Sequence, residues 1–581
     1  MKIRTFYIVL FLVFVVLGIY YPSVFAPINT VDDKAMVLSI MNSSHFSFKG
    51  LFFPGISGYY YRPLLGLTFY ADDSLWGLQP SFMHLENILL HALNVILVFL
   101  VARGIFKRHG LHNILAQLSA ALLFALHPIN TEPVNWISGR TDLLAGTFIL
   151  LSMLLLLRAL ESNRILTCAL ASFSLLLACF AKDVAIFFFP ASLLMIWHFD
   201  ESREDTLYSS LLSSLKRRAL FYASFFFVVL AYFTCRRVAF NKADTGIAQA
   251  AGGIIGHEVN ILYTLKVMVK LLGFYAKKLF FPWPLNFAIT KVPNYYIIVG
   301  VMVLVAAVYM FYRRELLADL FLTSICVISP AFLVALNRMA WTPIAERYLY
   351  IPCATFSIGI TLVVYCLCKK MRFEKYSPIL VVLICATSAF ATVNRNIVWQ
   401  DNLTLYEDTV RKSPDFPPAQ NELAVALKEH GKDKEGNRII KSNQVPEGTK
   451  NREFAELNRA NVLTAEGDLD SARRLLLDNL NPNSAVYNNI LTKLINIDEC
   501  RLNKLDRNVK TQQIRAEIIG FLSKLQANTG DAFYNYRIGQ YYLAMGDTKD
   551  ARNCFATAYE KAPAEAYYKL PAKKLADKLR Q

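Results

Sequence analysis

Apolar runs long enough to cross a membrane fill the chain from residue 6 to residue 393, and polar segments separate them. The runs lie at 6–26, 84–106, 112–127, 143–160, 165–181, 184–198, 219–235, 296–312, 317–336, 349–368 and 376–393. Runs of about 20 apolar residues are typical of transmembrane helices. The pattern therefore predicts an all-α, polytopic membrane bundle of about eleven spans, preceded by Lys2 and Arg4 and anchored by an uncleaved first span.

One further helical pattern, at 258–281, is not counted as a span. Its lysines recur at helical spacing beside aromatic and aliphatic residues: Lys266, Lys270, Lys277 and Lys278. Counting it as a span would move Arg313-Arg314 to the opposite side of the membrane from the other basic loops. We therefore expect an interfacial or re-entrant helix here.

Basic residues in the loops set the expected topology. With eleven spans, the following fall on one side: Lys107-Arg108, Arg158 with Arg164, Lys216-Arg217-Arg218, Arg313-Arg314 and Lys369-Lys370-Arg372. An excess of Lys and Arg marks the cytoplasmic side. Arg236-Arg237 lies on the other side, which implies a misplaced boundary or a partner for these arginines. The odd number of spans places the tail on the same face as the first loop, 27–82.

From residue 394 to residue 581 a mixed-charge, helix-forming composition replaces the apolar runs. The spacing of small and aromatic residues through Gly539, Gly546-Asp547, Ala551 and Phe555 matches the 34-residue tetratricopeptide repeat. Weaker copies surround Gly431 and Gly467, 36 residues apart, and the 79 residues from Gly467 to Gly546 leave room for a divergent repeat. The sequence thus predicts a membrane domain at 1–393 and an α-solenoid at 394–581.

The net charge of +17 belongs mostly to the membrane half, because residues 394–581 carry 29 Lys and Arg against 25 Asp and Glu. Positive-inside loops explain this excess, and so does a cationic pocket for a phosphorylated lipid. The ten cysteines lie mostly in apolar runs without metal-ligand spacing, which is typical of buried small side chains.

The first loop holds the adjacent acids Asp32 and Asp33 a few residues after the first span, followed by Tyr60-Tyr61-Arg62. Placing two carboxylates so near a bilayer is energetically unfavourable, so acids in such positions usually have a function. Capping of the amphipathic stretch 34–48 is the simpler alternative, and we favour a chemical role.

Other loops on the same predicted face add polar residues: His127, Glu132, Arg140, Asp142, Lys182, Glu346 and Arg347. Charges at membrane depth usually face a bundle interior or an aqueous cavity, so a shared site is expected. Arg140 with Asp142, and Glu346 with Arg347, are equally compatible with local ion pairs. Asp72-Asp73 is expected to cap a turn or helix. His127 has no metal-ligand spacing and is expected to be structural.

These motifs together carry a resemblance. The order is Asp-Asp in the first loop, Tyr-Arg-Pro-Leu, then His127-Pro-Ile-Asn-Thr-Glu-Pro-Val-Asn-Trp-Ile-Ser-Gly-Arg-Thr-Asp142, then Ala345-Glu-Arg-Tyr-Leu-Tyr-Ile-Pro352, then the repeats. It resembles the transmembrane-and-tetratricopeptide-repeat protein O-mannosyltransferases and their bacterial relatives, within the C-type glycosyltransferase superfamily. The resemblance covers almost the whole chain, although this chain has fewer repeats than the animal members usually carry.

The resemblance implies transfer of a sugar, typically mannose, from a polyprenyl phosphate to a Ser or Thr hydroxyl of a protein, with inversion. It assigns the catalytic carboxylate to Asp32 or Asp33, and we favour Asp32 slightly. The leaving phosphate needs cations, for which Arg62, Arg140, Lys182 and Arg347 are candidates. His127, Glu132, Asp142 and Glu346 are expected to support them. A divalent metal is possible but not favoured, because Asp32 and Asp33 are contiguous.

Two alternatives remain open: the same fold with a glycan or lipid acceptor, and a non-enzymatic membrane scaffold for the repeats. The expected partners are the polyprenyl-phosphate sugar, an acceptor protein or peptide bound by the repeats, and membrane lipids, with no nucleic acid. The expected location is a bacterial inner membrane with the repeats in the periplasm, or alternatively an endoplasmic reticulum membrane with the repeats in the lumen.

Overall fold

The protein is described here from a computed structural model, which covers residues 2–580 except 42–45, 55–59, 200–205, 241–260, 314–315, 338–340, 343, 374–376, 448–451, 483, 485 and 505–508. Over this part of the chain the structure is helical, and the one β-bridge joins Ile289 to Ile344. Contacts divide the chain into two compact units, Met1–Leu423 and Ala424–Gln581. The all-α, polytopic fold expected from the apolar pattern is confirmed.

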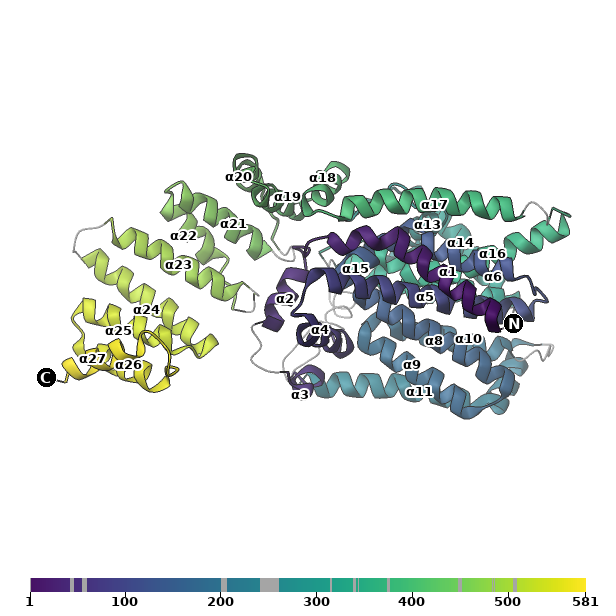
Figure 1. Ribbon diagram of the computed structural model, residues 1–581, viewed down its shortest axis with the longest axis horizontal. Helices are drawn as coiled ribbons and strands as arrows, with labels where there is room; N and C mark the ends of the chain where they lie inside the picture. The colour runs from purple at the N-terminus through teal and green to yellow at the C-terminus, as the bar shows by residue number, and fades with distance from the viewer. Residues whose placement is uncertain are drawn as a thin grey trace. The chain divides into compact units, whose positions relative to one another are not determined.

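The helices of the first unit run nearly parallel through much of the bundle (Figure 1). They are α1 (Lys2–Tyr20), α5 (Pro80–Arg108), α6 (Ile114–Leu126), α8 (Arg140–Ser162), α9 (Ile165–Ala181), α10 (Phe188–Phe199), α11 (Leu207–Ala239), α13 (Ile261–Phe280), α14 (Tyr296–Arg313), α15 (Leu316–Asn337), α16 (Tyr350–Lys370) and α17 (Ser377–Trp399). One continuous cluster of buried apolar side chains extends from α1 to α16.

Each predicted span coincides with an apolar helix. Among the described residues, seven helices are long and apolar enough to cross a membrane, and α6 with the helical turn after it forms an eighth, bent candidate. The three remaining predicted spans match shorter apolar helices: Ile165–Ala181, Asp183–Phe199 and Tyr296–Tyr312. The chain is therefore a multi-pass integral membrane protein.

The segment predicted to be interfacial or re-entrant, 258–281, begins outside the described residues; its described part forms α13, which packs closely along α14. A Cβ atom on Gly273 would lie 2.1 Å from the Tyr296 carbonyl oxygen, and one on Gly300 would lie 1.9 Å from that of Val269. Glycine is required at both positions because the two backbones touch there. The close approach brings the C-terminal end of α13, with the buried Lys278, into the bundle.

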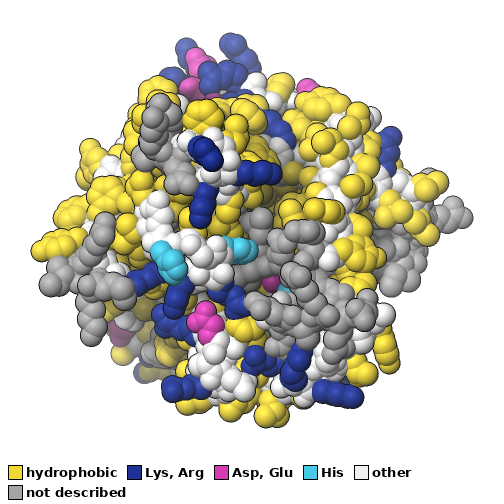
Figure 2. Space-filling model, turned by 90° about the vertical axis from the view of Figure 1, so that its right-hand side faces the viewer, with side chains coloured by type: hydrophobic (Ala, Val, Ile, Leu, Met, Phe, Trp, Pro, Cys, Tyr) yellow, Lys and Arg dark blue, Asp and Glu magenta, His cyan; other side chains and the backbone are white. Residues whose placement is uncertain are grey.

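The two ends of the bundle differ in chemistry. Lys and Arg side chains are spread over the end at which the N-terminus lies, and Asp and Glu are few there (Figure 2). At the other end lie the short helices of the first loop, α2 (Asp33–Met41), α3 (Phe48–Phe52) and α4 (Pro63–Trp76) (Figure 1). The elements that cap this end include η2 (Pro128–Asn130), α7 (Thr131–Asn135), η3 (Ile137–Gly139), η4 (Asp183–Phe187) and η5 (Glu346–Leu349).

After α17 come α18 (Asn402–Lys412) and α19 (Pro417–Glu429), and then the helices of the second unit. These are α20 (Asp433–Ser442), α21 (Arg452–Ala465), α22 (Leu469–Asp478), α23 (Tyr487–Leu502), α24 (Val509–Thr529), α25 (Ala532–Met545), α26 (Thr548–Lys561) and α27 (Lys569–Lys578). Gly431, Gly467 and Gly546 have φ of 75°, 88° and 89°. Each ends the first helix of a pair, as expected for glycines at these turns.

The interval between Gly467 and Gly546 holds a further helix pair, α23 and α24, where the sequence left room for a divergent repeat. Within the last pair, a Cβ atom on Gly539 of α25 would lie 2.8 Å from the ring of Phe555 on α26. The small residue thus makes space for the aromatic one, as the repeat pattern predicts. Helix pairs built in this way form an α-solenoid.

Candidate active site

Asp33 joins the first loop to the loop before α8. Its side chain is 1% exposed, and Oδ1 accepts hydrogen bonds from the backbone N–H of Ser138, at 2.8 Å, and from the Ser138 hydroxyl. Oδ2 accepts a longer bond from the Asn29 N–H, at 3.4 Å. Burial raises the Asp33 pKa to about 7, against the lowering effect of the Ser138 hydrogen bonds. Asp32, one residue earlier, is only half-buried.

The loop from His127 to Asp142 folds into short helical turns that aim its charged residues at different partners. Gly139 permits the tight fold, because a Cβ there would lie 2.4 Å from the Pro133 carbonyl oxygen. Glu132 accepts from Arg347 Nη1 at 2.6 Å and from the backbone N–H groups of Glu346 and Arg347, each at 3.1 Å. Glu132 therefore fixes the start of η5.

Glu346 does not pair with its neighbour Arg347, so the alternative of a local ion pair is wrong here. Its Oε1 lies 2.6 Å from Lys278 Nζ and accepts from the Asn286 N–H at 3.1 Å. Lys278 also donates to the carbonyl oxygens of Pro282 and Pro284. The two members of the Glu-Arg dipeptide thus tie η5 to two different segments, because adjacent side chains diverge from a 3-10 turn.

Lys182 and Asp142 form a buried ion pair, with Nζ 2.5 Å from Oδ1. Burial lowers the Lys182 pKa to about 8; Asp142 opposes this shift, and the positive charges of Arg62 and Arg347 reinforce it. The centroid of the Tyr348 ring lies 5.5 Å from Lys182 Nζ and 5.0 Å from Arg347 Cζ. Lys182 and Arg347 therefore both contact one aromatic ring.

Asp183 gathers a second group of cations beside the first. Arg62 Nε lies 3.4 Å from its Oδ2, and its Oδ1 accepts from Arg236 and, at 2.7 Å, from the Tyr232 hydroxyl. The Arg62 guanidinium also stacks on Tyr60, 4.1 Å from the ring centroid. Sequence reasoning assigned Asp183 no specific role, and it left Arg236 with either a misplaced span boundary or an unidentified partner. The signal in the sequence was the predicted position of Arg236 on the side of the membrane where basic loop residues are rare. Its partner is Asp183.

Arg140 lies in a separate buried network. Its Nη1 is 2.7 Å from Asp72 and its Nη2 is 2.9 Å from Glu86, while Nε donates to Asn87 Oδ1 at 3.1 Å. Arg140 therefore does not pair with Asp142, and the expectation that Asp72 only caps a turn is wrong. Asp72 lies in the last turn of α4, which is too late for N-capping, and its burial requires the cation.

His127 is buried at the bend after α6. Its Nε2 lies 3.0 Å from the Leu279 carbonyl oxygen, and its Nδ1 accepts from the Ile129 N–H at 3.3 Å. Both ring nitrogens have backbone partners, so the histidine joins the bend to the end of α13. Within the described ranges, no group of three or more His, Cys, Asp and Glu side chains lies close enough to hold a metal ion.

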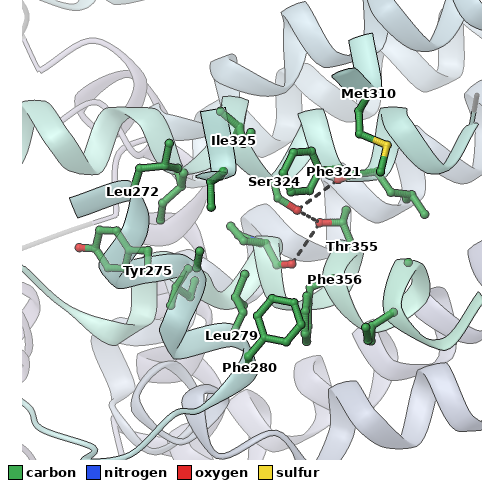
Figure 3. A pocket seen from close by; sticks show the side chains of 18 of the residues that line it. Leu272, Tyr275, Leu279, Phe280, Met310, Phe321, Ser324, Ile325, Thr355 and Phe356 are labelled. Carbon is green, nitrogen blue, oxygen red and sulfur yellow. Dashed lines mark hydrogen bonds between the residues drawn. The ribbon is translucent and has the colours of Figure 1, made fainter. Parts of the chain in front are cut away.

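An apolar cavity of about 210 Å³ lies between α13, α14, α15 and α16 (Figure 3). Tyr275, Leu279 and Leu349 are among its lining residues. Two hydroxyl groups on its wall bond to each other, because Ser324 Oγ and Thr355 Oγ1 lie 2.6 Å apart, and Thr355 also donates to the Pro352 carbonyl oxygen. Leu349 follows Arg347 and Tyr348 in the chain, so the cavity approaches the cationic group.

The described site thus combines an acid-bearing loop, a cluster of cations and an adjacent apolar cavity in a membrane bundle. Four cationic side chains, Arg62, Lys182, Arg236 and Arg347, lie among three carboxylates, those of Glu132, Asp142 and Asp183. The local excess of positive charge suits an anionic group. A cationic cluster beside an apolar cavity is chemically suited to a molecule with an anionic head and an apolar tail.

Comparisons with known proteins point to one group of membrane proteins. The chain is 25% identical to human protein O-mannosyl-transferase TMTC3 over 400 residues, 63% of this chain and 42% of the relative. It is 41% identical to human TMTC1 over 104 residues and 43% identical to human TMTC4 over 114 residues. These two alignments cover 18% of this chain and 11% and 15% of the relatives.

Each aligned region covers less than half of these curated relatives. No family model matches the chain. The chain is therefore similar to proteins named as protein O-mannosyl-transferases.

Proposed function

We propose that this protein is a C-type membrane glycosyltransferase that moves mannose from a polyprenyl phosphate to a Ser or Thr hydroxyl of a protein. The observation that carries the proposal is one short loop, Ser138 to Asp142, which contacts both the acid pair and the cations: Ser138 binds Asp33, and Asp142 binds Lys182. One segment thus contacts both the neighbour of the proposed base and one of the proposed phosphate ligands, and so fixes their loops relative to each other. The similarity to proteins named O-mannosyl-transferases supports the choice of sugar and acceptor.

Arg62, Lys182 and Arg347 are the proposed ligands of the donor phosphate. Lys182 and Arg347 both contact the Tyr348 ring, and the charge of Arg62 acts on Lys182. Guanidinium groups can hold two phosphate oxygens at once, and they stabilise the charge that develops as the phosphate leaves. The apolar cavity beside Leu349 is the proposed entrance for the polyprenyl tail, because it is enclosed by aliphatic and aromatic side chains.

Asp32 is the proposed general base. The acceptor hydroxyl oxygen attacks the anomeric carbon, Asp32 takes the hydroxyl proton, and the bond between that carbon and the phosphate oxygen breaks with its electron pair on the phosphate. Attack opposite the leaving group inverts the configuration. Asp33 has its oxygens committed to Ser138 and Asn29, and it holds the loop in place.

The remaining predicted residues have supporting roles in this proposal. Glu132 and Glu346 fix the segment that carries Arg347, Asp142 holds Lys182, and His127 joins the loop to α13. Arg140 was a candidate phosphate ligand; because Asp72 and Glu86 occupy it, we now assign it to bracing α4 against α5 and α8. The repeats are the proposed receptor for the acceptor protein, on the non-cytoplasmic face of a bacterial inner membrane or of the endoplasmic reticulum.

The test is transfer from radiolabelled polyprenyl-phosphate mannose to membrane protein by the full chain in lipid nanodiscs. Asp32→Asn is expected to lower kcat by at least about 100-fold, because removing a positioned base costs 10²–10⁴-fold. Asp73→Asn is the matched control, since Asp73 is an exposed acid of the same loop. It is expected to retain wild-type activity.

Undiminished transfer by Asp32→Asn would remove Asp32 as the base. Transfer to a glycan or lipid instead of protein would keep the fold and the chemistry but change the acceptor. If the wild-type chain transfers no lipid-linked sugar, the proposal fails and a scaffold role for the repeats is favoured.

A further inference from the structure

Two helices at the C-terminal end of the first unit, α18 and α19, form hydrogen bonds to the segment that precedes Asp32 and Asp33. Asn29 and Thr30 come just before Asp32, and both contact Tyr406 of α18. The Tyr406 hydroxyl donates to Asn29 Oδ1 at 3.1 Å and lies 2.8 Å from Thr30 Oγ1. Thr30 Oγ1 also donates to Glu422 Oε2 of α19, at 2.6 Å.

A small displacement of the Tyr406 hydroxyl would be transmitted through Asn29 to the residues on either side of Asp32. Tyr406 is completely buried, and its ring packs at 6.4 Å from the ring of Phe287. Its partner Asn29 uses the same Oδ1 to accept from the Val31 N–H at 2.9 Å, and the Asn29 backbone N–H donates to Asp33. The chain of contacts therefore runs from Tyr406 through Asn29 to both sides of Asp32.

Other polar contacts fix the same segment to α17 and α18. Asn396, Gln400 and Asn402 donate side-chain amide hydrogens to the carbonyl oxygens of Ile19, Pro22 and Ile28, at 2.8, 3.2 and 3.1 Å. These bonds hold the backbone where it leaves α1. The bonds of Tyr406 and Glu422 are the ones that reach Asn29 and Thr30, next to the acids.

We infer that Tyr406 and Glu422 are positioning residues for the acid pair, so that α18 and α19 form part of the transferase site. This inference rests on the proposed function for its kinetic consequence. Ser138 fixes the loop from the side of the bundle, and Tyr406 fixes it from the side of the helices that lead into the repeats. A displacement of about 1 Å at a reacting group costs up to about 100-fold in rate.

Tyr406→Phe removes the hydroxyl and keeps the ring, so the packing against Phe287 is preserved. We expect kcat to fall by about 10-fold to 100-fold, with the donor KM within 2-fold of wild type, because Tyr406 contacts none of the proposed phosphate ligands. Glu422→Ala is expected to act in the same direction, and Glu422→Gln to retain kcat because its amide oxygen still accepts from Thr30. Tyr567→Phe, at a 76% exposed ring, is the matched control.

Hydrogen exchange at residues 29–36 gives a readout that does not depend on activity. Faster exchange of these amides in Tyr406→Phe than in wild type and Tyr567→Phe, at equal melting temperature, supports the inference. Unchanged exchange or unchanged kcat overturns it. If the wild type transfers no sugar, the proposed function fails, and the exchange measurement alone decides whether Tyr406 positions the loop. Should Tyr406→Phe not fold, Glu422→Ala replaces it.

Discussion

At the scale of single residues, the site is built from charges that meet partners from other loops. Lys182 meets Asp142, Arg347 meets Glu132, and Lys278 meets Glu346, in each case at 2.5–2.6 Å. A buried charge that loses its partner is strongly destabilising, whereas a pair removed together is tolerated better. When one member of such an ion pair is substituted, the other member should be substituted as well, so that a change in activity is not caused by an unpaired buried charge.

The Lys182 ammonium is expected to make donor binding depend on pH. Because its pKa is about 8, the positive charge is lost as pH rises through 8. The donor KM of the wild type should therefore rise above pH 8, as measured by initial rates between pH 6.5 and 9.5. Lys182→Met should raise KM about 10-fold to 100-fold at pH 7, the value of a hydrogen bond to a charged group.

The double variant Lys182→Met/Asp142→Asn separates binding from folding, because it leaves no unpaired buried carboxylate. Its KM should stay high and should not change with pH over the same range. A wild-type-like rise of KM above pH 8 in the double variant would show that another group titrates there.

Asp33 is expected to make the stability of the protein depend on pH. Its pKa is raised from 3.8 to about 7, so between these values the folded chain binds more protons than the unfolded chain. The Asp33 contribution to the free energy of unfolding is then fully present below about pH 4 and is lost as pH rises through 7. Asp33→Asn should reduce the fall in melting temperature between pH 5 and pH 8, read by tryptophan fluorescence in detergent. An identical pH profile in both proteins would contradict the raised pKa.

At the scale of helices, the apolar pattern predicts most of the fold because a membrane span is a local property of about 20 residues. All predicted spans have an apolar helix, and the divergent repeat is present as α23 and α24. The site pairs could not be predicted in the same way. Arg347 and Glu132 are separated by 215 residues and Arg140 and Asp72 by 68, so only the three-dimensional packing brings them together.

The packing of α25 on α26 gives a prediction at this scale. Gly539→Val should destabilise the last repeat pair by about 1–3 kcal/mol, because the new side chain would overlap the Phe555 ring. Gly520 of α24 has no atom within 4 Å of a built Cβ, so Gly520→Val is the control and should change stability by less than about 0.5 kcal/mol. Hydrogen exchange of the α25 and α26 amides measures both, and equal protection in the two variants would contradict the close contact.

At the scale of the whole molecule, the arrangement of spans determines which compartment the site and the repeats face. The basic end shown in Figure 2 is expected to be cytoplasmic, because Lys and Arg are retained on that side. An odd number of spans then places the first loop and the repeats together on the opposite side. The proposed transferase would then take its lipid-linked donor from the bilayer and its acceptor from the non-cytoplasmic compartment.

Single cysteines test this topology in sealed membranes. Asp73→Cys and Lys549→Cys, both at exposed positions, should react with a membrane-impermeant maleimide from the non-cytoplasmic side, and His112→Cys only after the membrane is opened. The exposed native Cys366 and Cys500 are first replaced by serine so that they do not react. If Asp73→Cys and Lys549→Cys react from opposite sides, the number of spans between them is odd. In that case α13, or one of the three shorter apolar helices, has been assigned incorrectly, and the repeats cannot present an acceptor to the acid pair.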